Sequence, residues 1–371
     1  MKIAFTGDMA FSKYFKNRCT DENLISDEVR EFLASTDYTV VNVEGSVSSG
    51  EISAAKPLVH ANPPECADFL KSINGYVWNL ANNHSMDCGA DGAYDTLKCA
   101  EENGCYTIGV GKNIEEAAKP LVLTKDVSVG LVSVTVAFDK EALATESTPG
   151  SIGIFDIERI KAQIDEVKSK CRWCVVVAHG NEEFSQLPMP NIRKLYKKYL
   201  QMGADIVVGH HPHVAENYET FGDKIIFYSL GNFIFDTDYQ RAQKYTDVGV
   251  LIKMDFGEND YSWEYMSTKI NRDTHTVSKC ECPKIFTNVS SCDYKLLWPL
   301  QAKHLRINEK IKITFIKPEM KSYSRWQWIV WGVKRMKEQR GKDVAWGLFF
   351  EIFKYWKLSK RKDVIEYIKR G

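Results

Sequence analysis

The sequence predicts an α/β fold in which a mixed sheet system is flanked by helices, and three observations lead to this prediction. First, residues 1–280 alternate short β-branched runs with amphipathic stretches, which is the rhythm of βαβ units. Second, after Gly209 short β-rich runs are separated by turn residues, a pattern typical of hairpins. Third, hydrophobic residues make up 44% of the 371 residues and charged residues 26%, which allows a large core. This composition excludes disordered, collagen-like and low-complexity proteins.

Each element is expected from its local pattern. Runs rich in Val, Ile and aromatic residues predict strands, and apolar residues three and four positions apart predict helices. Gly104 is placed to end the third helix. The expected strands of the first part are 3–6, 39–43, 76–81, 121–123, 127–138, 174–178 and 205–208. The expected helices are 23–34, 64–73, 89–103, 157–170 and 192–202. Successive antiparallel strands are expected at 214–219, 224–228, 249–254 and 261–270.

Composition divides the chain into three segments. Residues 1–280 form the expected main domain, residues 281–320 carry weak signals and are expected to be an irregular connecting segment, and residues 321–371 are basic, aromatic and helical in pattern. The last segment holds 14 Lys or Arg, 5 Asp or Glu and five of the nine tryptophans. The formal net charge of zero therefore combines a charge of +9 on residues 321–371 with a charge of −9 on residues 1–320.

The extension, residues 324–370, allows three interpretations. Its aromatic residues at helical spacing can dock on the main domain while Lys and Arg face water. The same pattern fits a peripheral membrane anchor, because interfacial helices combine Trp and Phe on one face with Lys and Arg on the other. Nucleic-acid binding is the least favoured interpretation, because no recognised module is present.

Location and redox state follow from what the sequence lacks. No apolar run approaches the roughly 18 residues that cross a bilayer, and residues 1–8 lack the apolar core of a signal peptide. We expect a cytoplasmic protein, with peripheral contact to the inner face of the membrane through residues 324–370.

The ten cysteines are dispersed, so reduced thiols are expected. Cys280, Cys282 and Cys292 lack a nearby fourth ligand for a structural zinc.

Polar residues suited to metal binding follow the expected strands. In an α/β sheet, functional groups gather where strands end and loops begin. Carboxylate, amide and imidazole groups together suit Mn, Fe or Zn, and two such ions about 3.5 to 4 Å apart suit hydrolysis of a phosphoester. The residues at the strand ends are Asp8, Asn42, Glu44, Asn82, Asn83, His84, His179, His210, His211 and His213.

Single residues of this set have simpler explanations. Asp8 can be a turn or N-cap residue, Asn82 can occupy a left-handed turn, and His179 can be a hydrogen-bonded core histidine. The run 210–213 differs, because three histidines within four residues around Pro212 have little structural purpose. Taken together, the residues predict one metal centre that holds one or two divalent ions.

An ordered series of motifs identifies a family. The motifs are Gly7-Asp8-Met9, Asn42-Val43-Glu44, Leu80-Ala81-Asn82-Asn83-His84 with Asp87, Gly89 and Gly92, Gly109-Val110-Gly111 with Asn113, Gly209-His210-His211-Pro212-His213 and Phe227-Tyr228-Ser229-Leu230-Gly231-Asn232-Phe233. Over residues 1 to about 255, the chain resembles the bacterial capsule-synthesis CapA family. That family includes proteins of poly-γ-glutamate synthesis and belongs to the calcineurin-like metallophosphoesterase superfamily.

The resemblance implies a fold and a set of roles. The implied fold is a four-layer α-β-β-α metallophosphoesterase-like sandwich with its metal site at the loop edge of the sheets, here followed by the C-terminal helical extension. His84 is implied as an acid beside the leaving group, and Asp87 and Glu183 are the other expected catalytic residues. The implied metal ligands are Asp8, Glu44, Asn83, His179, His211 and His213. The residues expected to support them are Asn42, Asn82, His210 and Asn232.

The sequence departs from the superfamily pattern at three places. Ala10 stands where the first motif, Asp-x-His, has a histidine. Asn42 and Glu44 replace a Gly-Asp pair, which leaves open which of them bridges two ions. Gly180 and Asn181 follow His179 where the family has Trp-Gly. The site is therefore expected to hold one tight and one weak ion, or to bind without turning over.

Two function classes follow from these residues. The leading hypothesis is a metal-dependent hydrolase of capsule or extracellular polymer synthesis, in which an activated water attacks a phosphoester or a related ester or amide of a polymer precursor. The alternative is a non-catalytic polymer-binding or assembly subunit, and a phosphatase of an unrelated small molecule is a weaker third interpretation. The loop 45–62 follows Glu44 directly and is expected to shape the choice of substrate.

Overall fold

We describe the protein from a computed structural model of the whole chain. The structure describes residues 1–49, 59–137, 142–284, 286–290, 293–298, 301, 324 and 327. Apart from Ser324 and Gln327, the predicted extension 321–371 lies outside the described residues, as does most of the expected connecting segment after residue 298. Every helix in the described part of the chain is too short or too polar to cross a lipid bilayer. All cysteines described there are free thiols.

The first sheet has its N-terminal strand near the centre. Within the described residues it contains eight strands, in the order β18-β17-β16-β1-β2-β5-β6, with β15 beside the end of β1. The strand β1 runs parallel to β2 and antiparallel to β16. The bounds are β1 Lys2–Met9, β2 Tyr38–Val43, β5 Val77–Asn79, β6 Tyr106–Ile108, β15 Asn232–Ile234, β16 Val248–Phe256, β17 Tyr261–Asn271 and β18 Thr276–Lys279.

The second sheet is built around the apolar strand that the sequence predicts at 174–178. Its order in the described part of the chain is β13-β14-β12-β11-β9-β8. The strands β9, β11, β12 and β14 run parallel to one another, and β8 and β13 are antiparallel strands at the two edges of the sheet. The bounds are β8 Leu121–Thr124, β9 Ser128–Thr135, β11 Trp173–His179, β12 Ile206–His210, β13 Tyr218–Phe221 and β14 Lys224–Phe227.

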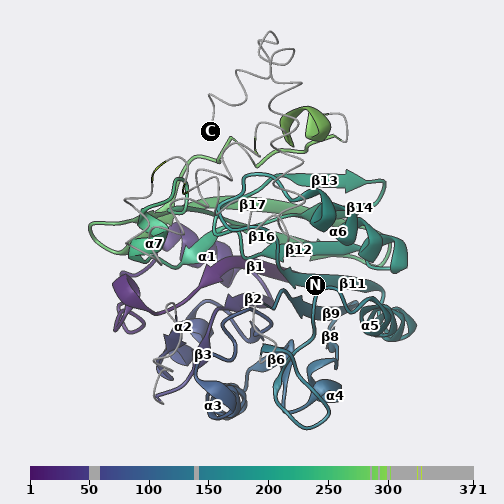
Figure 1. Cartoon of the computed structure of the whole chain (residues 1–371), viewed down its shortest axis with the longest axis horizontal. Coiled ribbons are helices and arrows are strands. Elements are labelled where there is room, and N and C mark those ends of the chain that lie inside the picture. The colour runs from purple at the N-terminus through teal and green to yellow at the C-terminus, as the bar shows by residue number, and fades with distance from the viewer. Residues whose placement is uncertain are drawn as a thin grey trace.

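The remaining elements are helices and two short strand pairs. The helices α1 and α2 lie on the left of the view in Figure 1, and α5 and α6 lie on its right. The strand β3 (Ser46–Val47) pairs with β4 (Ala61–Asn62), and β7 (Val110–Gly111) pairs with β10 (Gly150–Ser151). The helices are η1 Lys13–Phe15, α1 Asp27–Ala34, α2 Cys66–Ser72, α3 Gly89–Glu102, α4 Ile114–Ala117, α5 Ile157–Lys170, α6 Pro190–Met202 and α7 Asp238–Arg241.

Three apolar clusters show that the domain has four layers. One cluster joins α1, α2 and α3 to the first sheet through residues such as Leu33, Leu70 and Val41. A second lies between the two sheets and contains Phe5 of β1 and Val177 of β11 among its members. The third joins α5 and α6 to the outer face of the second sheet. The expected α-β-β-α sandwich is therefore confirmed.

Several predicted elements need correction. The helix α5 has the predicted bounds, but the helix expected at 23–34 begins only at Asp27. A turn occupies its first residues, where Leu24 N donates to Asp21 O. The strand expected at 214–219 begins at Tyr218, because the chain before it passes the site. The strand β14 pairs antiparallel with β13 but parallel with β12, so this part is not a simple series of hairpins.

Residues beyond the predicted main domain also pack on it. Residues 293–298 are helical. Leu187 lies in an apolar cluster with Val289, Tyr294 and Leu297. The Tyr294 hydroxyl donates to the Pro188 carbonyl at 2.7 Å. This segment therefore supports the loop between β11 and α6.

Candidate metal centre

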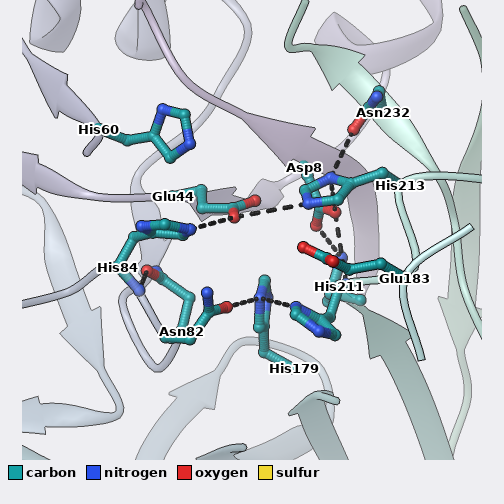
Figure 2. A network of polar contacts seen from close by, with 12 residues as sticks. Asp8, Glu44, His60, Asn82, His84, His179, Glu183, His211, His213 and Asn232 are labelled. Atoms are coloured by element: carbon teal, nitrogen blue, oxygen red, sulfur yellow. Dashed lines mark hydrogen bonds and ion pairs between the residues drawn. The ribbon is translucent and has the colours of Figure 1, made fainter. Parts of the chain in front are cut away.

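The predicted site residues come together at the edge where strands of both sheets end. Asp8 ends β1, Glu44 follows β2, and His84 follows β5 in the first sheet. His179 ends β11 in the second sheet, and His211 follows the neighbouring strand β12. Figure 2 shows these side chains pointing toward one another across the gap between the sheets' ends. The topology therefore explains why residues more than 200 positions apart lie in one cluster.

Asp8 is at the centre of this cluster and is fully buried. Its carboxylate accepts a hydrogen bond from Asn42 Nδ2 at 2.8 Å and lies 3.1 Å from His213 Nδ1. His210 Nδ1 lies 3.3 Å from the other side of the same group, and His211 N donates to it at 3.3 Å. Burial raises the pKa of Asp8, but the hydrogen bonds with His210 and His213 outweigh burial and hold it well below the usual range. Asp8 is therefore an anion in this site.

The surroundings of the Glu44 carboxylate indicate whether these residues could hold a metal ion. Its side chain is fully buried, and neither carboxylate oxygen has a hydrogen-bond partner among the residues that the structure describes. Nε2 of His84 and Nε2 of His213 each lie 3.8 Å from Oε1. Burial raises the pKa of Glu44 to about 7, against the opposing effect of His213. A buried carboxylate without donors is costly unless it meets a cation, so this residue fits a metal ligand.

His179 brings further ligand atoms to the same place. Its Nε2 lies 2.9 Å from Asn83 Oδ1 and 3.2 Å from His211 Nδ1. Burial lowers the pKa of His179 well below its usual value, so the ring carries a free electron pair. One ligand atom each of Asp8, Glu44 and His179 lie within 4.8 Å of one another, and all three residues are buried. Carboxylate, imidazole and amide groups in this arrangement fit Mn, Fe or Zn.

His213 connects the two carboxylates of the cluster. Besides its contacts with Asp8 and Glu44, its Nδ1 lies 3.0 Å from Asn232 Oδ1. Burial lowers the pKa of His213, but Glu44 and Asp8 outweigh it and raise the pKa to about 9. The backbone of His211 and His213 is left-handed, with φ of 95° and 58°, which non-glycine residues rarely adopt. Such strain is typical of functional sites.

His84 and Asp87 form a hydrogen-bonded pair beside Glu44. His84 Nδ1 lies 2.6 Å from Asp87 Oδ2, and Asp87 is only 1% exposed. The opposite ring nitrogen therefore faces Glu44 and the interior of the cluster. Burial lowers the pKa of His84, but Asp87 and Glu44 outweigh it and raise the pKa above its usual value. This arrangement orients His84 to deliver a proton from Nε2.

Glu183 enters the cluster from the loop after β11. Its Oε2 accepts a hydrogen bond from the Tyr239 hydroxyl at 3.1 Å. The adjacent Phe184 has a left-handed backbone, and its ring lies 6.2 Å from the ring of His213. Figure 2 shows the Glu183 carboxylate on the side of the cluster across from His84. Glu183 is therefore placed to contact whatever approaches the site.

The residues expected to support the ligands make different kinds of contact. Asn42 donates to Asp8 and lies 3.3 Å from His179 Nδ1, so it connects a residue of the first sheet to one of the second. Asn82 accepts from the backbone of Gly45 and His84 and donates to Val43 O, which ties two strand ends together. Ala10 is fully buried, and its methyl group offers no ligand. An apolar side chain therefore occupies the position at which the superfamily's Asp-x-His motif has its histidine.

Sequence reasoning missed three parts of the site. Asn79 Nδ2 donates to Asn42 Oδ1 at 2.6 Å, although Asn79 was expected only as part of a strand. Asn181 Nδ2 donates to both carboxylate oxygens of the buried Glu216, which holds the turn after His179. His60 lies beside His84 with its ring directed toward Glu44. His60 follows no predicted strand, so no periodic signal marked it.

Known proteins resemble this chain in sequence. A family model described as bacterial capsule synthesis protein PGA_cap matches residues 2–237. The chain is 32% identical over 255 residues to the capsule biosynthesis protein CapA of Bacillus anthracis, which covers 66% of this chain and 62% of that protein. It is 32% identical over 250 residues to the PGA biosynthesis protein CapA of Bacillus subtilis, which covers 66% of this chain and 65% of that protein. The chain thus spans less than two thirds of the length of either relative.

Solved structures align with the chain at low sequence identity. The 5'-nucleotidase of Candida albicans aligns with 82% of this chain and 58% of its own, at 12% identity and a TM-score of 0.43.

Proposed function

Because the chain belongs to the family of bacterial capsule synthesis proteins described as PGA_cap, we propose that it is a metal-dependent hydrolase of capsule or extracellular polymer synthesis. The proposed substrate is a phosphoester, or a related ester or amide, of a polysaccharide or poly-γ-glutamate precursor. The names of the two CapA relatives support the polymer assignment. The geometry of the site supports the reaction class.

One observation carries the proposal. Asp8, Glu44 and His179 are buried together with ligand atoms within 4.8 Å, and the Glu44 oxygens lack donors in the described part of the chain. Building such a cluster costs free energy, because two carboxylates are removed from water. A divalent cation held by these residues offsets that cost. The proposed ligand set also includes Asn83, His211 and His213, which contact these three residues.

The residues around the ligands have separate roles in the proposed reaction. A divalent ion, when bound, supplies an electrostatic clamp on phosphoryl oxygens and lowers the pKa of a water molecule. Asp87 accepts a hydrogen bond from His84 Nδ1 and so keeps Nε2 directed at the leaving-group oxygen, to which His84 gives its proton. Glu183 and Tyr239 line the approach from the opposite side. Burial of the cluster keeps bulk water away from the reacting group.

Metal content and turnover, measured on the same samples, test this function. Protein purified without chelator is analysed for Mn, Fe and Zn and assayed with an aryl phosphate. We expect one or two ions per chain and metal-dependent hydrolysis in the wild type. The variants His211→Ala and Asp8→Ala are expected to lose both, because each removes a proposed ligand. The matched control is His275→Ala, since His275 lies between β17 and β18 and packs on Tyr14.

Two results would contradict the proposal. Full metal content and full turnover in His211→Ala would show that the cluster does not hold the ion. A wild type that binds metal but hydrolyses no ester or amide substrate would remove the hydrolase function while leaving the metal site.

Ala10 favours a second candidate function. The superfamily pattern has a histidine at this position, whereas Ala10 has a buried methyl group that provides no ligand. A site with an incomplete ligand set fits a polymer-binding or assembly subunit that keeps the fold without turnover. This candidate predicts binding of an anionic polymer, measured by calorimetry, with no hydrolysis under any of several metals. Metal-dependent hydrolysis at a useful rate would exclude it.

A further inference from the structure

His60 is a buried histidine whose side chain is held from several directions. It is 5% exposed, and its backbone N–H donates to Asp87 Oδ2 at 2.9 Å, the same oxygen that contacts His84. Its ring packs edge-on against His84, with centroids 4.4 Å apart, and against Phe235 at 4.8 Å. The ring therefore has one well-defined orientation.

Gly45 shows how close His60 lies to the ligand Glu44. The backbone of Gly45 is left-handed, with φ of 91°, and a Cβ there would lie 2.2 Å from His60 O and 2.8 Å from His60 Cβ. Only glycine allows this approach. His60 therefore packs closely against Gly45, the residue that follows Glu44 in the sequence.

The two ring nitrogens of His60 have different surroundings. Nδ1 lies 3.1 Å from Ser12 Oγ, whose hydroxyl can donate to it and leave the ring proton on Nε2. Nε2 has no hydrogen-bond partner among the described residues, and Figure 2 shows the ring directed toward Glu44 and the interior of the site. Nε2 is not one of the fully buried polar atoms that lack a partner, so it is accessible from the site, where a ligand can accept a hydrogen bond from it.

His60 lies outside the most compact group of candidate ligand atoms. The set of ligand atoms within 4.8 Å of one another contains Asp8, Glu44 and His179 but not His60. His60 instead stands at the side of the cluster, next to His84, the proposed proton donor. An oxygen of the substrate's reacting group would lie within this space if its leaving group faces His84.

We propose that His60 is a substrate-binding residue whose Nε2–H donates a hydrogen bond to an oxyanion of the substrate, beside His84. This inference rests on the proposed function and adds to it a residue and a ligand class, a phosphoryl or carboxylate oxygen. Ser12 acts through His60, because its hydroxyl holds the ring in the tautomer that donates. His60 belongs to the loop 45–62, which is expected to shape the choice of substrate.

Binding of simple oxyanions tests the inference without turnover. Metal-loaded full-length protein is titrated with inorganic phosphate and, separately, with glutamate, by calorimetry. His60→Phe keeps the aromatic packing and removes the donor, and it should weaken binding of the preferred anion about tenfold or more, with metal content unchanged. His60→Gln retains a donor and should recover part of the affinity. His275→Gln is the matched control and should bind as the wild type does.

Kinetics provide a second readout. In the aryl phosphate assay, His60→Phe should raise KM more than it lowers kcat, and Ser12→Ala should shift KM in the same direction to a smaller extent. Wild-type affinity for both anions in His60→Phe, or no binding of either anion by the wild type, would overturn the inference. If His60→Phe does not fold, His60→Gln and Ser12→Ala decide, because an unchanged affinity in both would also overturn it. A wild type without turnover contradicts the proposed function only, since the titration still reports on His60.

Discussion

Single residues next to the ligands leave little room for change. A Cβ at Gly7 would lie 2.2 Å from Gly231 O, a backbone atom that cannot move without its strand. Asp8 follows Gly7 directly and pairs with Asn232 of β15, where the ladder is irregular between Asp8 and Met9. The close approach of the two backbones therefore sets the position of the central carboxylate. Glycine at residue 7 is required by packing and not by its backbone angles.

Gly7→Ala is accordingly expected to lower both stability and metal affinity. Overpacking of this kind costs about 1–3 kcal/mol, and relief of the clash moves Asp8 away from His213. Urea unfolding and metal analysis measure the two effects. Gly153→Ala is the control, because among the described residues a Cβ there would meet only the two methyl carbons of Leu143, at 3.5 and 3.7 Å. Equal stability of Gly7→Ala and wild type would show that β15 shifts freely.

Among the elements, the two sheets are tied together at the end opposite the site. Asp37, which precedes β2, accepts from Lys2 N of β1 at 2.7 Å and from Lys125 Nζ at 2.8 Å. Lys125 lies in the turn between β8 and β9 of the second sheet. Burial raises the pKa of Asp37, but the hydrogen bonds with Lys125 and Lys2 outweigh it and lower the pKa below its usual 3.8. Asp37 thus links the first strands of both sheets.

A pH dependence follows from this link. Because the folded-state pKa of Asp37 lies below the unfolded-state value, its contribution to stability is present above about pH 3.8 and is lost as the pH falls through the folded-state pKa. Asp37→Asn should cost about 0.5–1 kcal/mol at pH 7, since the pair with Lys125 is partly exposed, and progressively less below pH 4. Urea unfolding at both pH values measures the difference, with the exposed Asp126→Asn as control. A constant difference at all pH values would contradict the role of the charge.

The elements also show what the sequence could predict. The helix α5 and the strand β11 follow from periodicity, because both bury one continuous apolar face or run. The late start of α1 was missed, because the turn at Asp21 depends on a side-chain hydrogen bond to Asn23 N. His60 was missed because its partner Ser12 lies 48 residues earlier and no repeat connects them. Local patterns thus predict the strand ends and the polar residues gathered on them, while the position of loop residues such as His60 requires the tertiary structure.

At the scale of the whole molecule, the proposed metal would join the two sheets. Asp8 and Glu44 belong to the first sheet, and His179 and His211 belong to the second. Besides the apolar cluster between the sheets, direct polar contacts such as that of Asn42 with His179 already join them here. A ligand that binds the folded state alone stabilises the folded protein by mass action. Metal binding is therefore expected to raise the free energy of unfolding of the whole domain.

Removal of metal is expected to lower the thermal midpoint by several degrees. At a free metal concentration 100 times the dissociation constant, the stabilisation is about 2.7 kcal/mol. Calorimetry of the wild type with and without chelator measures the shift, and metal added back should restore it. The variant His211→Ala should show the same midpoint in both conditions. A chelator-independent midpoint in the wild type, with metal shown to be removed, would contradict the link between sheets.

The position of β16 has a practical consequence for work on this family. The family match ends at residue 237, yet β16 lies between β1 and β17 inside the first sheet, with Ile3 opposite Met254. A fragment trimmed to the matched region would leave the backbone of β1 without its neighbour, and a bare strand edge recruits other chains. Such a fragment would aggregate in expression trials although every proposed metal ligand is present. The recombinant boundary should therefore be set by the sheet, beyond β18, and not by the extent of sequence similarity.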